Sequence, residues 1–131
     1  MHSKEEFRDL IRQRIHDENW TELFIGGACY FFALILHEEL HLPLFYASPA
    51  DRDEFRHVFV MQGRQCIDYL GRRPVEIVAG LYAEWPDVPP RPTTTGEVMS
   101  RIREKGFGDD LEKQLLSLAR TQFHQHREKY S

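Results

Sequence analysis

Two histidines and a glutamate stand in the spacing of a zinc site. The stretch HEELH, residues 37–41, fits the pattern H-E-x-x-H, in which two histidines one turn apart bind zinc and Glu38 would act as general base. A catalytic zinc needs a third protein ligand, and no later segment offers a clear one. Pro43 stops the helix just beyond the motif. We therefore favour a polar last turn in which His37 and His41 complement the helix dipole, with zinc chemistry as the alternative.

A thiol lies near the start of the same helix. Cys29 comes two residues after the pair Gly26-Gly27, at the beginning of a long apolar run. The unpaired N–H groups and the positive end of a helix dipole favour a thiolate at such a position. The paired glycines would also let a substrate backbone come close. A cysteine can equally be a small apolar core residue, so this thiol predicts chemistry only if a base lies beside it.

A predicted hairpin supplies that base. Two strand-like runs, HVFVM and RQCIDYL, flank Gln62-Gly63, which is a turn signal. A two-residue turn there sets His57 directly opposite Asp68 on one face of the hairpin, close enough to hydrogen-bond. The carboxylate would fix the imidazole tautomer and support its charged form. A one-residue slip would separate the pair onto opposite faces, so this prediction depends on the turn. Together with Cys29, these residues form a nucleophile, a base and an orienting acid.

The elements that must position these residues indicate an α+β fold. Ser3 to His16 predicts an amphipathic helix with Ser3 as N-cap, and residues 17–21 read as a polar break. The remaining expectations are a buried helix over about 28–40, a short strand over 43–47, the hairpin, an ambiguous segment RRPVEIVAGLY, an extended stretch from Trp85 to Pro92, helices over 97–105 and 109 to about 125, and a frayed tail from His124.

Composition limits the class of protein. The 131 residues predict a single domain over 1–131, and the 41% hydrophobic and 29% charged residues are typical of a globular chain. A net charge of -4 argues against a broad nucleic-acid surface. The longest apolar run, Ala28 to Leu36, is about half a membrane span. Without a signal sequence, and with only Cys29 and Cys66 as cysteines, we expect a cytoplasmic protein with free thiols.

The segments GGACYFFALILHEELHLPL, RHVFV and CIDYLG together resemble the papain-like (NlpC/P60- and transglutaminase-like) cysteine hydrolase superfamily, and are most similar to its small bacterial and phage members. In this superfamily the cysteine opens the central helix, and the histidine and acidic residue come from adjacent strands of a small antiparallel sheet. The resemblance covers residues 26–71. It implies Cys29 as nucleophile, His57 as general base and Asp68 as orienting residue, with no cofactor.

The resemblance also implies an oxyanion hole. Papain-like enzymes usually place a side-chain donor shortly before the cysteine, and here Asn19 or Thr21 could serve, with Gly27 as a further candidate for oxyanion or substrate binding. The N–H group of Cys29 is a further donor. The expected function is thiol-dependent acyl chemistry on an amide or isopeptide, as a peptidase, amidase or deamidase. Its partner would be a protein or peptide-like substrate, with no nucleic acid or membrane. The alternatives are a zinc peptidase that uses HEELH, or an inactive interaction domain of the same fold.

Overall fold

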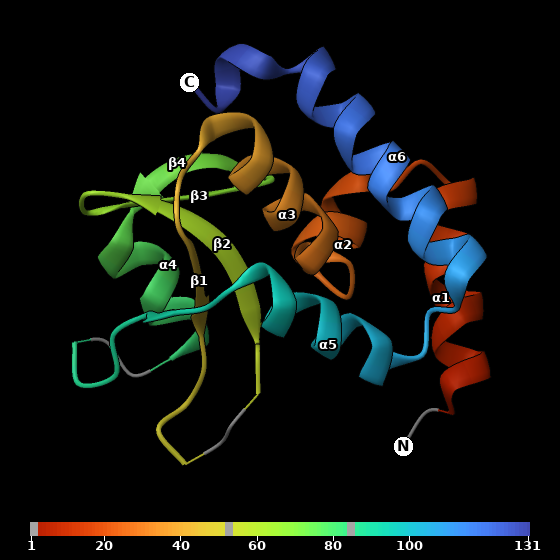
Figure 1. Ribbon diagram of the computed structural model, residues 1–131, viewed down its shortest axis with the longest axis horizontal. Coiled ribbons are helices and arrows are strands. Elements are labelled where there is room, and N and C mark those ends of the chain that lie inside the picture. The colour runs from red at the N-terminus through yellow and green to blue at the C-terminus, as the bar shows by residue number, and fades with distance from the viewer. Residues whose placement is uncertain (1–2, 52–53, 84–85) are drawn as a thin grey trace.

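The computed structural model describes residues 3–51, 54–83 and 86–131. In this part of the chain, six α-helices and a five-stranded antiparallel sheet form an α+β fold, as predicted (Figure 1). The sheet order is β4-β3-β2-β1-β5. The elements are α1 (Lys4–His16), α2 (Trp20–Ile25), α3 (Cys29–Leu40), β1 (Leu44–Ala47), β2 (His57–Gln62), β3 (Gln65–Asp68), β4 (Gly71–Pro74), α4 (Val75–Tyr82), β5 (Arg91–Pro92), α5 (Thr95–Lys105) and α6 (Asp109–Gln125).

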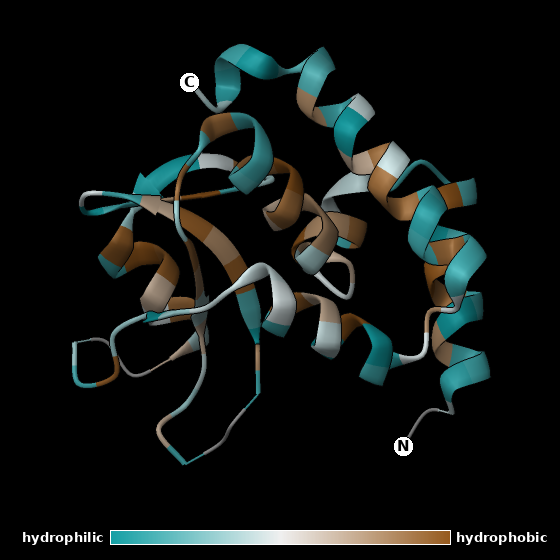
Figure 2. Ribbon diagram, in the orientation of Figure 1, coloured by the Kyte–Doolittle hydropathy of each residue, from teal (hydrophilic) through white to brown (hydrophobic). Residues whose placement is uncertain are grey.

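Helix α3 is the centre of the fold and has the predicted bounds. Its residues from Cys29 to Leu36 are all buried, because it lies between the sheet and α6 (Figure 1). A helix that is apolar all round is stable only in such a buried position. Figure 2 shows the hydrophobic residues gathered on α3 and β2, with hydrophilic residues on the outer sides of α1 and α6. The helix ends at Leu40, and its C-cap residue His41 adopts a left-handed conformation with φ of 57°.

The sheet carries a separate core on each face. Along β2, Val58 and Val60 belong to the cluster around α3, whereas Phe59 packs with Val78 and Ala79 of α4. This alternation is the ordinary consequence of the strand repeat of two. His57 lies two residues before Phe59, so both belong to the α4 side of β2.

The segment before α3 contains a helix that the sequence reading missed. Residues 17–21 were predicted as a polar break, but Asn19 is the N-cap of α2 and its side chain accepts a hydrogen bond from the N–H group of Glu22. Asn and Asp are among the best N-cap residues. Leu23 and Phe24 bury the apolar side of this short helix. Helices α1 and α2 therefore enclose the turn that leads into Cys29.

In the second half of the chain, the structure differs in detail from the predicted elements. The ambiguous segment forms both elements, since β4 ends at Pro74 and α4 begins at the next residue. Of the predicted extended stretch, Trp85 lies outside the described residues, and Arg91–Pro92 form β5. Helix α6 has the predicted bounds, whereas α5 begins two residues before the predicted start because Thr94 caps it.

The predicted fraying of the tail is wrong, because Tyr130 is fully buried. Its hydroxyl donates to the carbonyl of Tyr69 at 2.8 Å, and its ring stacks on Phe123. An aromatic ring that is buried and also hydrogen-bonded ties the end of the chain to the β3–β4 turn. Within the described ranges, no helix is both long and apolar enough to cross a membrane.

Candidate functional site

His57 and Asp68 form a buried hydrogen-bonded pair on adjacent strands. The Nε2 atom of His57 lies 2.7 Å from Oδ2 of Asp68, and the two residues are 0% and 3% exposed. The prediction that both side chains share one face of the hairpin is confirmed. A buried ionic pair is costly unless each member is well hydrogen-bonded, so the remaining partners of the pair decide what it can do.

The predicted register of the hairpin is wrong by two residues. Gln62 is not in the turn but pairs with Gln65, so the turn residues are Gly63 and Arg64. Gly63 has φ of +60°, and a two-residue hairpin turn of the II′ type requires such a conformation at its first central position. The observed register continues to Phe59 opposite Asp68. His57 is therefore a diagonal neighbour of Asp68, which an imidazole can still reach.

Asp68 is held by three donors. Besides His57, the Nη2 group of Arg73 donates to Oδ2 at 2.6 Å, and the N–H group of Leu70 donates to Oδ1 at 2.9 Å. The bond to Leu70 spans two residues, which is the usual way an aspartate stabilises a turn. Burial raises the pKa of Asp68, but the hydrogen bond and charge of His57, with Arg73 and Leu70, outweigh burial and lower it. Asp68 is therefore an anion in the folded protein.

The His57 ring is enclosed by aromatic side chains. Tyr82 of α4 stacks on it with ring centroids 4.3 Å apart and an interplanar angle of 19°, and Phe59 lies at 5.6 Å. Burial lowers the pKa of His57, but the hydrogen bond to Asp68 and the interaction with the Cys29 sulfur outweigh burial and raise the pKa to about 9. Such a histidine carries a positive charge at neutral pH.

Cys29 is the third residue that interacts with the His57 ring. The Nε2 atom is hydrogen-bonded to Asp68, whereas the buried Nδ1 atom has no hydrogen-bond partner among the described residues. The Cys29 sulfur contributes to the raised pKa of His57, and Nδ1 is the ring nitrogen that Asp68 leaves without a partner. The structure thus brings together the three residues that the sequence selected, while their chemical roles stay a prediction.

A cavity of about 390 Å³ leads to the thiol. Cys29 itself is only 3% exposed, and it lines this cavity together with Gly26, Gly27 and the aromatic side chains of Tyr30 and Tyr82. The remaining lining residues come from α1, the end of α2, the loop before β2 and the end of α5: Phe7, Ile25, Glu54, Phe55, Arg56 and Lys105. The cavity is large enough for an extended peptide-like group or one side chain.

Two of the predicted oxyanion residues have different positions. Gly27 lines the cavity, and a Cβ atom there would lie 3.1 Å from Phe7 and 3.2 Å from Ile11. Its small size is therefore explained by the packing of α1. Asn19 is not among the described lining residues, because its side chain caps α2. The N–H group of Cys29 makes a long bond of 3.4 Å to the carbonyl of Gly26, which leaves it only weakly held.

The HEELH motif lies at the opposite end of α3 from Cys29. The Nδ1 atom of His37 lies 2.6 Å from the carbonyl oxygen of Leu42. His41 is the C-cap residue of α3 and has a left-handed conformation, so it lies outside the regular helix. Glu38 is paired with Arg120 at 2.9 Å. In the described ranges, no group of three histidine, cysteine, aspartate or glutamate residues could hold a metal ion.

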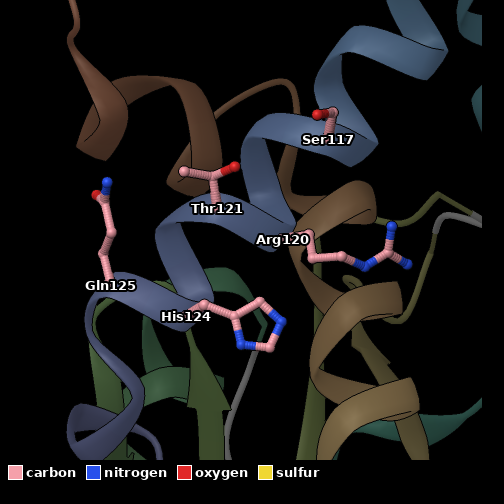
Figure 3. Close-up of a pocket in the computed structure, with 5 residues that line it drawn as sticks. All are labelled: Ser117, Arg120, Thr121, His124 and Gln125. Atoms are coloured by element: carbon pink, nitrogen blue, oxygen red, sulfur yellow. The ribbon is translucent and has the colours of Figure 1, made fainter.

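The other partners of this motif come from α6. Figure 3 shows Arg120 and His124 extending from α6 toward α3, beside a cavity of about 490 Å³ that Ser117, Thr121 and Gln125 also line. His124 lies 3.4 Å from Glu39, the second glutamate of the motif. These contacts join the last turn of α3 to α6. The polar turn favoured from the sequence therefore has a packing role in the helix–helix contact.

Arg73 and Tyr82 are the site residues that sequence reasoning missed. The strand β4 was not recognised as a third strand, although Gly71 pairs with Asp68 across a two-residue turn. In that register Arg73 lies opposite Cys66 and so on the same face as Asp68. Recognising a second hairpin would have indicated Arg73. Nothing in the local pattern indicates the stacking of Tyr82, which depends on how α4 folds back on the sheet.

No family model matches the chain, and the comparisons with curated proteins and with solved structures give no match either. A function for this protein must therefore come from the site itself.

Proposed function

We propose that this protein is a papain-like thiol enzyme that carries out acyl chemistry on an amide or isopeptide bond. The observation that carries the proposal is the buried His57–Asp68 pair at 2.7 Å, whose second ring nitrogen is left for the thiol of Cys29. Ionisable groups with strongly perturbed pKa values beside a cavity are typical of functional sites. The placement of Cys29 at the start of a central helix, with His57 and Asp68 on adjacent antiparallel strands, supports the papain-like assignment.

The charge state of His57 defines its part in the reaction. With a pKa raised to about 9, it is an imidazolium at neutral pH and faces the sulfur as a cation. An adjacent imidazolium favours the thiolate form of a cysteine, which is the nucleophilic form. Asp68 stabilises the imidazolium without taking its proton, as the carboxylate does in other triads.

The proposed reaction has two halves. The sulfur of Cys29 attacks the carbonyl carbon, the C–N bond breaks, and His57 gives its proton to the departing amine, which leaves a thioester. Water or another nucleophile then attacks the thioester, His57 takes the proton, and the C–S bond breaks to restore the thiolate. The N–H group of Cys29 is the donor best placed to stabilise the oxyanion of each step. The substrate is a protein or peptide-like amide that enters through the cavity beside Tyr30 and Tyr82.

The first test is the alkylation rate of Cys29 by iodoacetamide at pH 6, read by mass spectrometry of the labelled peptides. We expect Cys29 to react at least about tenfold faster than a free peptide thiol, since an adjacent imidazolium activates a cysteine sulfur. His57→Gln should remove this advantage. Cys66 is an internal control, because it is fully buried and burial, with the charge of Asp68, raises its pKa to about 12. A Cys29 that reacts no faster than the free thiol would overturn the proposal.

The second test asks whether the site turns over. Incubation with p-nitrophenyl acetate should release a burst of nitrophenol equal to the protein present, with one acetyl group on the Cys29 peptide. Cys29→Ser should abolish the burst. A protein that alkylates rapidly but shows neither burst nor turnover would instead be the inactive interaction domain.

A further inference from the structure

The carboxylate of Asp68 is shared between the imidazole and a second cation. Arg73 donates to Oδ2 at 2.6 Å, which is the same oxygen that His57 contacts at 2.7 Å. We propose that Arg73 is a positioning residue of this site, which keeps Asp68 ionised and turned toward His57. Arg73 does not contact the thiol or the ring in any described interaction, so it acts through Asp68.

The geometry leaves Asp68 little freedom. One oxygen accepts from His57 and Arg73, and the other accepts from the N–H group of Leu70. Rotation of the carboxylate would break at least one of these bonds inside a region that is 3% exposed. A buried acceptor that loses its donor is penalised by its full desolvation. The three donors come from β2, β4 and the β3–β4 turn, so the orientation of Asp68 is determined by the sheet.

The electrostatic argument points the same way. Burial disfavours the charged form of Asp68, and the positive charges of His57 and Arg73 oppose this effect of burial. Arg73 is permanently charged, whereas His57 loses its charge during the proposed reaction. When His57 is neutral, Arg73 is therefore the charge that keeps Asp68 an anion. An arginine that is 23% exposed at its side chain is only partly screened by solvent.

The other titratable groups near Asp68 do not compete in the acid range. Cys66 on β3, Tyr82 on α4 and Tyr130 near the C-terminus all feel its charge. Burial comes first, and the Asp68 charge contributes further, in raising the pKa of each of them. All three are protonated at low pH, which leaves Arg73 and His57 as the cations that set the titration of Asp68.

The neighbouring residue is a matched control. Arg72 lies on the same strand and pairs in register with Ile67, so it belongs to the opposite face from Arg73. Its Nη1 group donates to the side chain of Gln65 at 3.2 Å. Arg73→Met and Arg72→Met remove the same charge and the same guanidinium from one strand, but only the first removes a partner of Asp68.

The direct experiment is an NMR titration of the Asp68 carboxyl carbon in the wild type and the two arginine variants. Loss of an opposite charge at hydrogen-bond distance raises a carboxyl pKa by about one unit or more. We expect that upward shift in Arg73→Met and an unshifted midpoint in Arg72→Met. An equal midpoint in all three proteins, or an equal shift in both variants, would overturn the proposal. If Arg73→Met does not fold, Arg73→Gln replaces it, with the same upward shift expected and no shift counting against the proposal.

A kinetic arm rests on the proposed function. As the pH falls and Asp68 becomes protonated, the alkylation rate of Cys29 in the wild type should drop to the rate in Asp68→Asn. In Arg73→Met this convergence of the two rates should occur about one pH unit higher. Arg72→Met should follow the wild type. A purely structural Arg73 would lower the melting temperature without moving the convergence, and that result would refute the positioning role. If Cys29 is alkylated in Asp68→Asn at the wild-type rate at every pH, the proposed triad is wrong. The NMR titration then still shows whether Arg73 controls the pKa of Asp68.

Discussion

The raised pKa of His57 predicts that the stabilisation from its bound proton is lost in alkali. Burial alone would lower this pKa, but Asp68 and Cys29 raise it to about 9, against an ordinary value of 6.5. The folded protein therefore holds this proton more tightly than the unfolded chain does. The resulting stabilisation is complete below pH 6.5, declines between pH 6.5 and 9, and is absent above pH 9. At about 1.4 kcal/mol per pH unit, the loss amounts to roughly 3 kcal/mol.

The measurement is the free energy of unfolding in urea at several pH values between 6 and 10, with a reductant present. The Cys29 thiol is coupled to His57, so the quantity to examine is the difference between Cys29→Ser and the double variant Cys29→Ser/His57→Gln, which share every other titrating group. We expect Cys29→Ser to lose up to roughly 3 kcal/mol more than the double variant across this interval. Adding Asp68→Asn to Cys29→Ser should reduce this loss, because the hydrogen bond to Asp68 is the largest contribution that raises the His57 pKa.

Two results would refute this reasoning. Parallel stability curves for Cys29→Ser and the double variant would mean that the proton on His57 is held equally in the folded and unfolded states. A Cys29→Ser stability that rises with pH relative to the double variant would mean that burial dominates and that His57 is neutral in the folded protein. In the second case His57 could still be a general base, but it would not face the sulfur as a cation.

Three substitutions test other features of the structure. Tyr82→Leu removes the ring stacked on His57, and we expect an NMR titration to show the His57 midpoint about half a unit lower, with Tyr82→Phe unchanged. Gly26→Ala would place a Cβ atom 2.5 Å from the backbone oxygen of Glu22, so thermal unfolding should show a loss of about 1–3 kcal/mol. The added Cβ atom of Gly80→Ala would meet nothing within 4 Å in the last turn of α4, so this variant should stabilise the protein by about 0.5–1 kcal/mol, and a loss there would contradict the open space.

Long, continuous helical patterns were predictable from the sequence because their signals are local. The apolar run of α3 and the proline that follows it defined a buried central helix with the observed bounds. The leucine spacing of α6 likewise predicted a helix with the observed bounds. The short helix α2 was missed because six residues contain too little periodicity, and Asn19 reads equally as a turn residue and as an N-cap.

Features that depend on tertiary packing were not predictable in this way. The chain end looks polar, yet Tyr130 is buried because the β3–β4 turn offers its hydroxyl an acceptor and Phe123 offers its ring a partner. The contact of Arg73 with Asp68 requires a third strand, and the sequence of that strand was ambiguous between strand and helix. The sequence next to Tyr130 and to Arg73 does not indicate which residues they will contact.

The prediction of the His57–Asp68 pair survived an incorrect register for a physical reason. The turn begins at Gly63 and not at Gln62, which shifts β3 by two residues along β2. Because strand side chains repeat every two residues, an even shift changes the partner but keeps the face. The shift turned a directly opposite pair into a diagonal one, and it placed Phe59 across from Asp68. That exchange suits the site, since the Phe59 ring lies 5.6 Å from the imidazole and helps to keep water from the pair. An odd shift would have put His57 and Asp68 on different cores, and no thiol chemistry would follow from Cys29 alone.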